Sequence, residues 1–548
     1  MATRTVRTLL LGGRGRPVVR GRGRRVARDR RPSLRRRAVA LLVLSAAVVA
    51  AIGAVIVAES HHAEPIRTTR IAPRPGGVPG TPLRAAVTIV TGARPVRVPD
   101  SFLGLSTEYW AVPEWQQEGS VLDRVLSLLH VPGDGPLILR IGGDSANEAL
   151  WESEVGQFPD WVVELTPAWL KQTSALVRRA HVRLILDLNL VTASPAISAE
   201  WAGAAEAALP RGSIAGFEIG NEPDLYSRKV WIKIVWETIA ASQLLPRSLS
   251  PSDYASDFGA YARTVTAVAP GVPLLGPAVA YPASGIGWIS TLLARGHPGL
   301  REVTAHEYPY SACARPRSSR YPTIAKLLSS QATAGMARGL APAVRQAHDA
   351  GLPFRLTELN SVTCGGRPGV SDTFATALWA PDALFELVRA GVDAVNVHVH
   401  PGKSNAAFSL SSGGLSANPL LYGLILFARA LGPDAALVPV HVTGSGAQRL
   451  DGWAVRVRPG ALHVLLINKG PRAVRTTVRL PRFGPASVER LRAPSAGSST
   501  GVTLDGQHLT RGGGWLGSRS TEVIQPVSGS YEVTVPAFSA ALLEASPA

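Results

Sequence analysis

Two glutamates in this chain occupy positions at which a side chain could act as an acid, a base or a nucleophile. Glu222 lies in the run GFEIGNEPDLY at residues 216–226, and Glu358 lies in FRLTELNSVTCGG at residues 354–366. Each ends a short apolar run typical of a buried strand and precedes a polar loop. In a parallel α/β barrel the active site is built at the carboxyl ends of the strands, so two such residues can meet. Paired carboxylates of this kind suggest glycoside hydrolysis.

A regular series of apolar runs predicts the strands that would position these glutamates. Eight runs end in polar or glycine residues, at 102–108, 137–144, 183–190, 216–222, 273–280, 303–309, 354–360 and 394–400. Between them lie stretches with helical spacing of apolar residues, for example at 166–180, 253–268 and 371–390. Alternating strands and helices imply a parallel sheet, and eight such units predict a (β/α)8 barrel over residues 100–420.

The pattern changes after about residue 420. Runs at 451–470, 473–480 and 529–545 alternate apolar and polar residues and are separated by Gly, Pro and Ser. This alternation predicts the antiparallel strands of a C-terminal β-sandwich, at 421–548. Residues 85–99 precede the barrel and show a similar alternation, so we expect them to supply a strand to the same sandwich.

The formal net charge of +18 is concentrated at the N-terminal end. Residues 1–37 contain 14 Arg and one Asp, so the rest of the chain carries only +5. No zinc-finger spacing or RNA-binding signature accompanies this basic arm, and we expect no nucleic-acid partner. The 548-residue length and the 46% hydrophobic content instead fit a globular enzyme with appendages.

The uncharged segment that follows the arm has the length of a membrane span. Residues 38–58 would form a helix of about 30 Å, which matches the thickness of a bilayer core. Arginines at 35–37 predict a transmembrane signal anchor, with the arm in the cytoplasm and the catalytic domain extracytoplasmic. A cleaved signal peptide is the alternative, and the body would then be secreted. Residues 59–84, with five prolines, predict an extended linker.

Six sequence motifs along the predicted barrel are similar to those of a known enzyme family. They are LRIGGDS at 139–145, GFEIGNEPDLY at 216–226, TAHEYPYSAC at 304–313, TELNSVTCGG at 357–366, GVSDTFATALWAPD at 369–382 and GVDAVNVHVHPG at 391–402. These motifs resemble glycoside hydrolase family 79, the β-glucuronidases and heparanase-like enzymes, within a clan of retaining glycosidases. The resemblance covers most of residues 100–545.

The resemblance implies a double displacement on a carbohydrate substrate. Glu222, after the fourth strand, would be the acid/base, and Glu358, on the seventh, the nucleophile. Asn221 would hydrogen-bond the sugar 2-hydroxyl, and Tyr308 would donate to Glu358. The residue chemistry agrees, because an ionised Glu358 close to Glu222 would raise the pKa of Glu222 and keep the acid protonated.

The choice of sugar depends on the loop after the eighth strand. In the resembled family this loop and a nearby tyrosine recognise the C6 carboxylate of a glucuronide. Here the loop is HPGKSNAAFSL at 400–410, and Phe408, which cannot donate a hydrogen bond, stands at the expected tyrosine. Lys403 either supplies a cation instead or is a solvated surface lysine. An uncharged β-glycoside, such as a glucoside, xyloside or galactoside, is therefore the alternative to a glucuronide.

Several other polar residues end predicted strands. They are Glu108, Asp144, His306, Asn396, His398 and His400. The two acids are candidates for contacts with sugar hydroxyls. The histidines and the asparagine match no tetrahedral metal motif, so we expect them to support the site through hydrogen bonds. No metal and no cofactor are predicted.

The two cysteines fall in loops that a barrel would make neighbours. Cys313 follows the sixth strand and Cys364 the seventh, so a disulfide is geometrically feasible and an exported location permits it. A metal pair or two free buried thiols is the alternative. A nucleophilic cysteine is disfavoured, because no dedicated base lies nearby in the sequence.

A non-catalytic cell-surface protein that binds carbohydrate is a third hypothesis. The joint presence of Asn221, Glu222, Tyr308 and Glu358 argues against it. Binding alone requires neither a nucleophile nor an acid.

Overall fold

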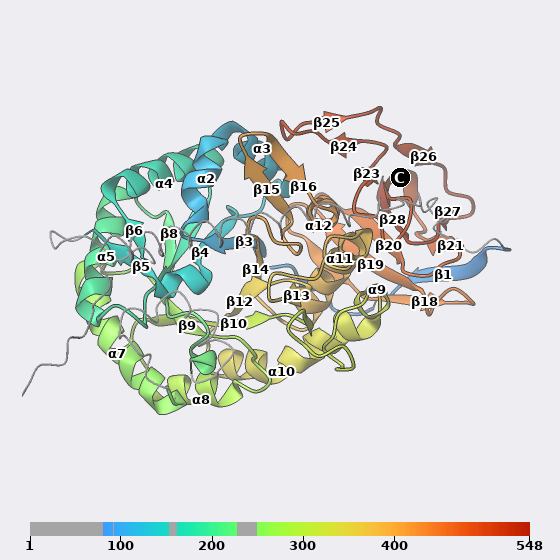
Figure 1. Ribbon diagram of the computed structural model, residues 1–548. Coiled ribbons are helices and arrows are strands. Elements are labelled where there is room, and N and C mark those ends of the chain that lie inside the picture. Colours follow the sequence, from blue (N-terminus) through green and yellow to red (C-terminus); the bar gives the residue numbers. More distant parts are fainter. Residues whose placement is uncertain (1–79, 91, 153–161, 227–248) are drawn as a thin grey trace, which may run out of the picture. The chain divides into compact units, whose positions relative to one another are not determined.

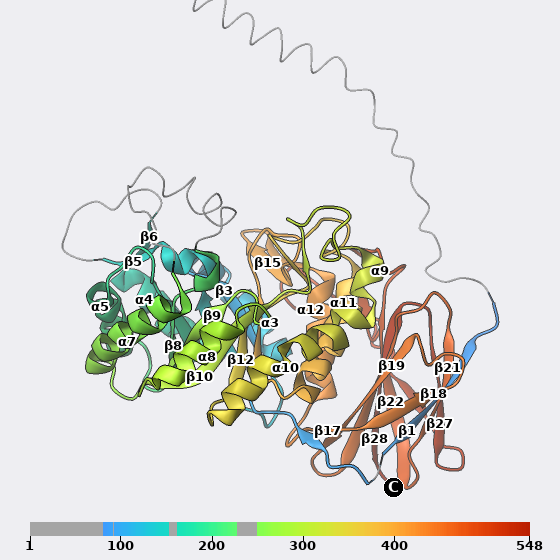
Figure 2. The same ribbon diagram turned by 90° about the horizontal axis from the view of Figure 1, so that it is seen from below.

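The computed structural model describes residues 80–90, 92–152, 162–226 and 249–548 (Figures 1 and 2). Eight parallel strands form a closed barrel and follow one another around it in the order of the sequence. They are β3 (Leu103–Glu108), β4 (Ile138–Gly142), β7 (Arg183–Leu188), β8 (Ile214–Ile219), β9 (Leu274–Val279), β10 (Leu300–Glu307), β12 (Phe354–Leu359) and β14 (Ala394–His398). Each strand overlaps one predicted apolar run, so the predicted (β/α)8 barrel is confirmed.

A helix follows each strand and covers the outside of the barrel (Figure 1). These helices are α3 (Gly119–Leu129), α4 (Pro167–Ala180), α5 (Pro195–Ala208), α7 (Pro251–Val268), α8 (Ile286–Arg295), α10 (Ala334–Asp349), α11 (Phe374–Arg389) and α12 (Pro419–Ala430). Thr166, Ser194 and Ser250 each accept a hydrogen bond from the backbone N–H three residues on, and a proline follows each of them. In each pair the Ser or Thr side chain caps the helix and the proline occupies its first position. These pairs therefore determine where α4, α5 and α7 begin.

The barrel strands carry apolar residues on one face and polar residues on the other. Leu139, Leu186 and Phe217 are fully buried in the main hydrophobic core. Successive side chains of a strand point to opposite faces, so the adjoining Arg140 and Asp187 point into the barrel, where they contact each other at 2.8 Å. The apolar face therefore holds the fold together, while the polar face is available for chemistry.

The C-terminal domain consists of two sheets packed face to face. One sheet has the order β18-β1-β21-β27 and the other β2-β17-β19-β20-β28-β22-β23, with β26 beside β22. The strands are β1 (Leu83–Ile89), β2 (Val96–Arg97), β17 (Ala436–Val438), β18 (Val440–Thr443), β19 (Leu450–Val457), β20 (Ala461–Asn468), β21 (Val474–Arg479), β22 (Phe483–Arg492), β23 (Thr503–Leu504), β26 (Glu522–Ile524), β27 (Ser530–Val535) and β28 (Ser539–Pro547). Val87, Val464, Val478 and Leu543 are buried in the core of this sandwich.

Strand β1 makes this sandwich differ from the all-antiparallel domain that we expected. It lies between β18 and β21, antiparallel to β18 but parallel to β21, with Val87 opposite Val442 on one side and Val478 on the other. Parallel neighbours need a long crossover connection. Here the whole barrel lies in the chain between β1 and β21, which provides that crossover.

The boundary between barrel and sandwich lies later than residue 420. Helix α12 packs against α11 and is the eighth barrel helix, so the sandwich strands that follow the barrel in the chain begin at β17. A buried ion pair joins the two parts, because Lys469 Nζ of the sandwich lies 2.5 Å from Asp382 Oδ2 of α11. Trp453 Nε1 donates to the other oxygen of the same carboxylate at 2.9 Å.

Short strand pairs shape the loops at the carboxyl ends of the barrel strands. They are β5 (Ala149–Trp151) with β6 (Val163–Leu165), β11 (Tyr310–Ser311) with β13 (Val362–Thr363), and β15 (Phe408–Ser411) with β16 (Gly414–Ala417). A further pair, β24 (His508–Leu509) with β25 (Trp515–Leu516), belongs to the C-terminal domain. The pairing of β11 with β13 brings the loops after the sixth and seventh barrel strands together.

The predicted basic arm, transmembrane segment and nearly all of the linker lie outside the described residues, at 1–79. Within the described ranges, no helix has both the length and the apolar character needed to cross a membrane.

Candidate active site

The carboxyl ends of the barrel strands open into a cavity of about 900 Å³. Its lining includes Asp144, Glu222, Tyr308, Glu358, His398 and Lys403, which come from loops or ends of five barrel strands. A cavity at this end of a (β/α)8 barrel is the place where such a fold assembles catalytic residues.

Glu222 stands just beyond β8 at a strained turn of the backbone. Its φ is 50° and its ψ is 50°, a left-handed conformation that is uncommon for glutamate. The backbone N–H of Glu222 donates to the carbonyl of Ala278 at 3.1 Å, which ties this turn to the end of β9. The short 3-10 helix Pro223–Leu225 then begins. The turn holds the carboxylate toward the cavity, where 16% of the side chain is exposed.

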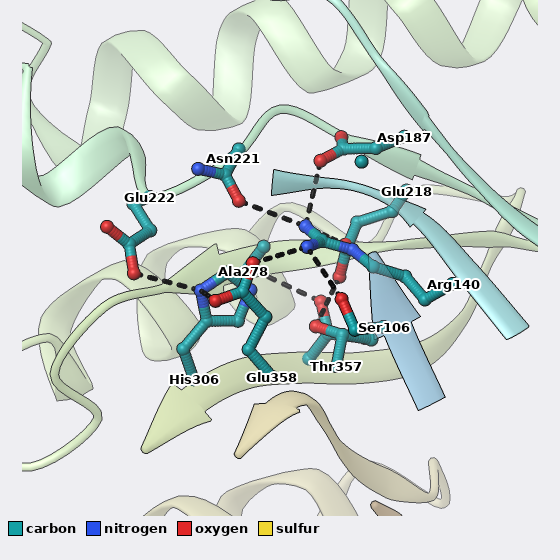
Figure 3. Close-up of polar contacts among 12 residues, drawn as sticks. Ser106, Arg140, Asp187, Glu218, Asn221, Glu222, Ala278, His306, Thr357 and Glu358 are labelled. Atoms are coloured by element: carbon teal, nitrogen blue, oxygen red, sulfur yellow. Dashed lines mark hydrogen bonds and ion pairs between the residues drawn. The ribbon is translucent and has the colours of Figure 1, made fainter. Parts of the chain in front are cut away.

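Glu358 lies within β12, and each of its carboxylate oxygens has a donor. Tyr308 Oη donates to Oε2 at 2.7 Å, as predicted, and Arg140 Nη1 donates to Oε1 at 2.6 Å. His306, on β10, lies between the two glutamates: its Nδ1 is 3.0 Å from Glu222 Oε1 and 3.7 Å from Glu358 Oε2 (Figure 3). An oxygen of Glu222 and an oxygen of Glu358 lie within 4.8 Å of each other.

Arg140 holds several polar residues of the site in place through its guanidinium group, and the sequence analysis did not single it out. Its side chain is fully buried, and besides Glu358 it contacts Asp187 and Glu218 at 2.8 Å each. Its Nη2 also donates to Asn221 Oδ1 at 3.0 Å (Figure 3). One guanidinium thus serves three carboxylates, which compensates for the cost of burying these charges together. The available signal was a charged residue inside three of the apolar runs, namely Arg140, Asp187 and Glu218.

The surroundings of Glu358 keep its carboxylate ionised. Burial raises the pKa of Glu358, but His398, His306, Arg140 and the Tyr308 hydrogen bond together lower it well below the usual value. Burial also lowers the pKa of His398, to about 4, so this imidazole is neutral near pH 7. The permanent cation next to Glu358 is therefore Arg140.

The surroundings of Glu222 have the opposite effect. Burial raises its pKa, and the nearby charge of Glu358 raises it further, while the hydrogen bond from His306 opposes both. The pKa of Glu222 is thus raised while that of Glu358 is lowered. A carboxyl group with a raised pKa can serve as an acid, and an ionised one as a nucleophile or base.

Asn221 is oriented by Arg140, and this orientation leaves one polar atom without a partner. Its Oδ1 accepts from the guanidinium, whereas its Nδ2 is buried and makes no hydrogen bond. An unsatisfied buried donor is costly unless a ligand completes it. The geometry is compatible with the predicted contact to a sugar hydroxyl.

Glu108 and Asp144 both line the cavity on the side of β3 and β4. Burial raises the pKa of Glu108 to about 8, and Asp144 contributes to the shift. Burial likewise raises the pKa of Asp144 to about 7, with Glu222 and Glu358 adding to it. Glu108 accepts from the backbone N–H of Ser145 at 2.9 Å, so one of its oxygens is already used. Asp144 opens into the cavity and is the freer of the two acids.

Of the remaining polar residues at strand ends, His398 lines the cavity and Asn396 does not. His398 lines the cavity, and its Nδ1 is 3.2 Å from Ser106 Oγ. Asn396 is fully buried below it, and its Nδ2 donates to the carbonyls of Leu105 and Ile138 at 2.8 and 3.0 Å. Its amide links neighbouring barrel strands, and its support of the site through hydrogen bonds stays a prediction. His400 also lines the cavity, with its ring 5.1 Å from that of Trp110.

The predicted disulfide is confirmed: Cys313 and Cys364 are bonded to each other. Both cysteines line the cavity. The bond joins the loop that carries Tyr308 to the loop that follows Glu358, directly beyond the paired strands β11 and β13.

Glu222, His306 and Glu358 also form a group whose ligand atoms are close enough to hold a metal ion. The guanidinium of Arg140, 2.6 Å from Glu358, already neutralises that carboxylate and would repel a second cation. The absence of a metal stays a prediction.

Comparison with known proteins finds similarity to glycoside hydrolases. Residues 452–542 match the family described as "Glycosyl hydrolase family 79 C-terminal beta domain". A β-glucuronidase from Aspergillus niger is 24% identical over 336 residues, which are 55% of this chain and 59% of the relative. The resemblance to glycoside hydrolase family 79 is confirmed. Because the match covers 59% of the relative from Aspergillus niger, this chain spans somewhat under two thirds of that relative's length.

Solved structures share the fold. A 4-O-α-L-rhamnosyl-β-D-glucuronidase from Fusarium oxysporum 12S has a TM-score of 0.67 at 18% identity, over 84% of this chain and 99% of that one. A family 51 arabinofuranosidase from Xanthomonas axonopodis pv. citri has a TM-score of 0.61 at 15% identity, over 85% and 100%. These two solved structures therefore share the fold of this chain.

The loop after the eighth barrel strand, at residues 400–410, was expected to contact the sugar. Its arrangement differs from our prediction at Phe408. Phe408 lies on β15, is fully buried and packs against Trp115 of helix α2 (Ala111–Gln117), with ring centroids 5.4 Å apart. Its predicted place in the sugar site is wrong, because the β15–β16 hairpin turns its ring into the core. Lys403, in contrast, is exposed and lines the cavity, with its aliphatic chain beside Gly365.

Proposed function

We propose that this protein is a retaining hydrolase of β-glycosides, with Glu358 as the nucleophile and Glu222 as the acid/base. The observation that carries the proposal is the approach of the two carboxylates to within 4.8 Å in opposite electrostatic surroundings. Retaining enzymes place their carboxyl groups about 5 Å apart, whereas inverting enzymes leave about 6.5–9.5 Å for a water molecule. The family 79 resemblance supports the same assignment.

In the first step, Glu358 would attack the anomeric carbon while Glu222 protonates the leaving oxygen. The bond between the sugar and the leaving group breaks, and an ester forms between the sugar and Glu358. In the second step Glu222, now a carboxylate, takes a proton from water, whose oxygen attacks the anomeric carbon and releases Glu358. Two inversions give net retention. Asn221 Nδ2 would donate to the 2-hydroxyl, a bond that strengthens in the transition state.

Within β-glycosides, we favour a β-glucuronidase-like specificity. Lys403 lines the cavity, and no ion pair joins it to any described residue, so its ammonium group can receive the C6 carboxylate. The alternative of an uncharged sugar stays open, because Phe408 cannot donate a hydrogen bond and its buried ring supplies no donor to the sugar. The relative from Aspergillus niger is named a β-glucuronidase, which favours the same substrate class.

A panel of aryl β-glycosides tests the activity, with glucuronide, glucoside, xyloside and galactoside side by side. We expect glucuronide hydrolysis by the wild type and its loss in Glu358→Gln, with an unchanged melting temperature. Glu200→Gln, which alters an exposed glutamate on α5, is the matched control and should keep full activity. Turnover by Glu358→Gln at the wild-type rate would overturn the assignment.

We further propose that the catalytic domain is extracytoplasmic, either anchored by residues 38–58 or secreted after cleavage. The disulfide between Cys313 and Cys364 supports an oxidising compartment. Protease treatment of intact cells should digest the catalytic domain if it is anchored outside. A domain protected until the membrane is lysed would contradict the proposal.

A further inference from the structure

We propose that Arg320 is a specificity-determining residue that binds an anionic group, a carboxylate or sulfate, on the leaving-group side of the substrate. The inference rests on the proposed function and adds the chemical class of the group beyond the scissile bond. It concerns the part of the cavity wall formed by the loops after β9 and β10.

The guanidinium of Arg320 lines the cavity with part of its hydrogen-bonding capacity unused. Its Nη2 donates to the carbonyl of Tyr308 at 3.0 Å, and its Cζ lies 4.6 Å from the ring centroid of Tyr281. Its Nε, in contrast, is buried and has no hydrogen-bond partner. No carboxylate among the described residues forms an ion pair with Arg320 within 4.0 Å. A half-buried guanidinium whose N–H groups are not all paired can donate to an anion at the cavity wall.

Glu307 is the charged residue that faces Arg320 from β10, and it also lines the cavity. Burial raises the pKa of Glu307 to about 7, and the charge of Arg320 works against that rise. The Glu307 carboxyl is near enough to sense the guanidinium but does not pair with it. An incoming anion therefore has no ion pair to displace.

The loop that carries Arg320 is held rigidly by its own contacts. Lys326 Nζ donates to the carbonyls of Ser318, Ser319 and Tyr321 at 3.0, 3.0 and 2.8 Å. Ser311 donates its backbone N–H to the carbonyl of Arg320 at 2.9 Å. A donor that is positioned before the ligand arrives loses little entropy on binding.

The topology assigns this part of the cavity wall to the leaving group. Asn221, which would hold the sugar 2-hydroxyl, is oriented by Arg140 of β4, so the reacting sugar lies toward β4, β3 and β14. The strands β9 and β10 connect β8 to β12 on the other side of the barrel. Glu222, at the end of β8, protonates the leaving oxygen, and the group attached to that oxygen then lies against Tyr281 and Arg320.

A pair of substrates with matched shape tests the proposal. They are the 4-carboxyphenyl and 4-carbamoylphenyl β-glycosides of the sugar that the wild type cleaves in the panel. We expect the wild type to favour the carboxylate, and Arg320→Gln to lower the carboxylate-to-carboxamide ratio of kcat/KM by about 10- to 100-fold. The ratio cancels any general loss of activity caused by the missing bond to Tyr308.

Arg317→Gln is the matched control, because Arg317 is exposed in the same loop and does not line the cavity; it should keep the wild-type ratio. Arg320→Lys should keep part of the preference, since it retains a cation. An equal rate for both substrates in the wild type, or an unchanged ratio in Arg320→Gln, would overturn the inference. Neither result would contradict the proposed function, which is contradicted only if Glu358→Gln remains active.

Discussion

Arg140 Nη1 donates to Glu358 Oε1 at 2.6 Å, while the guanidinium lies wholly inside the barrel. The contact joins residues 218 positions apart in the sequence, and through Nη2 the same side chain orients Asn221. The nucleophile and the amide that would hold the 2-hydroxyl are thus positioned by one cation, so both depend on Arg140.

Arg140→Lys should therefore damage catalysis more than stability. The ammonium keeps the charge, but it cannot contact Glu358, Asp187, Glu218 and Asn221 together. We expect kcat to fall by about 100- to 1,000-fold. The pKa of Glu358 should rise, and since the nucleophile must be ionised, the acid limb of kcat/KM should move to higher pH.

Arg211→Lys, at an exposed position before β8, is the control for that substitution and should behave as the wild type. Thermal unfolding checks that the Arg140→Lys barrel is intact. A folded variant with wild-type kcat and an unmoved acid limb would show that Arg140 does not position the nucleophile.

His306→Ala should shift the whole pH profile upward. The imidazole lowers the pKa of Glu222 through its hydrogen bond and lowers the pKa of Glu358 through its charge. Without it both values rise. The acid then stays protonated to higher pH, which moves the alkaline limb up, and the nucleophile ionises later, which moves the acid limb up. Measurement of kcat/KM from pH 4 to 9 checks this, and a limb that moves to lower pH would contradict it.

Lys403→Gln should weaken the preference for a glucuronide. Loss of a cation beside the sugar carboxylate should lower kcat/KM for the aryl β-glucuronide by about 10- to 100-fold and leave the aryl β-glucoside nearly unaffected. Phe408→Tyr is informative beside it, because a ring buried against Trp115 cannot reach the sugar. The glucuronide-to-glucoside ratio should be unchanged in Phe408→Tyr, and a change there would reopen its place in the site.

Removing the disulfide should destabilise the protein. Cys313 and Cys364 are 51 residues apart, so the bond restricts a loop of that length in the unfolded chain. The double variant Cys313→Ser/Cys364→Ser should lose about 2–4 kcal/mol of unfolding free energy, measured by urea denaturation. Wild-type protein in a reducing agent should match the variant. A loss of less than about 0.5 kcal/mol would mean that β11 and β13 hold these loops without help.

The sequence predicted the barrel because its strands are short apolar runs, most of which are followed by polar or glycine residues. Glu222 and Glu358 were identified for the same reason, since both stand at such ends. Arg140 and its carboxylate partners were missed, because their meaning depends on contacts between strands that are distant in the chain. Phe408 was misplaced because nothing in its loop indicated a hairpin that turns the ring toward α2.

The pairing of β1 with β21 shows the same limit in the second domain. Alternation along residues 85–99 predicts a strand, but it does not say which neighbour the strand joins or in which direction. The parallel pairing arises because the whole barrel lies between the two strands in the chain.

Covalent trapping with a 2-fluoroglycoside tests the central claim most directly. The fluorine slows both steps, and an activated leaving group lets the first step proceed, so the glycosyl-enzyme accumulates. Peptide mass spectrometry of the wild type treated with the 2-fluoro β-glucuronide should find the added sugar on Glu358, and Glu358→Gln should remain unlabelled. A label on another residue, or hydrolysis with inverted anomeric configuration, would contradict the account.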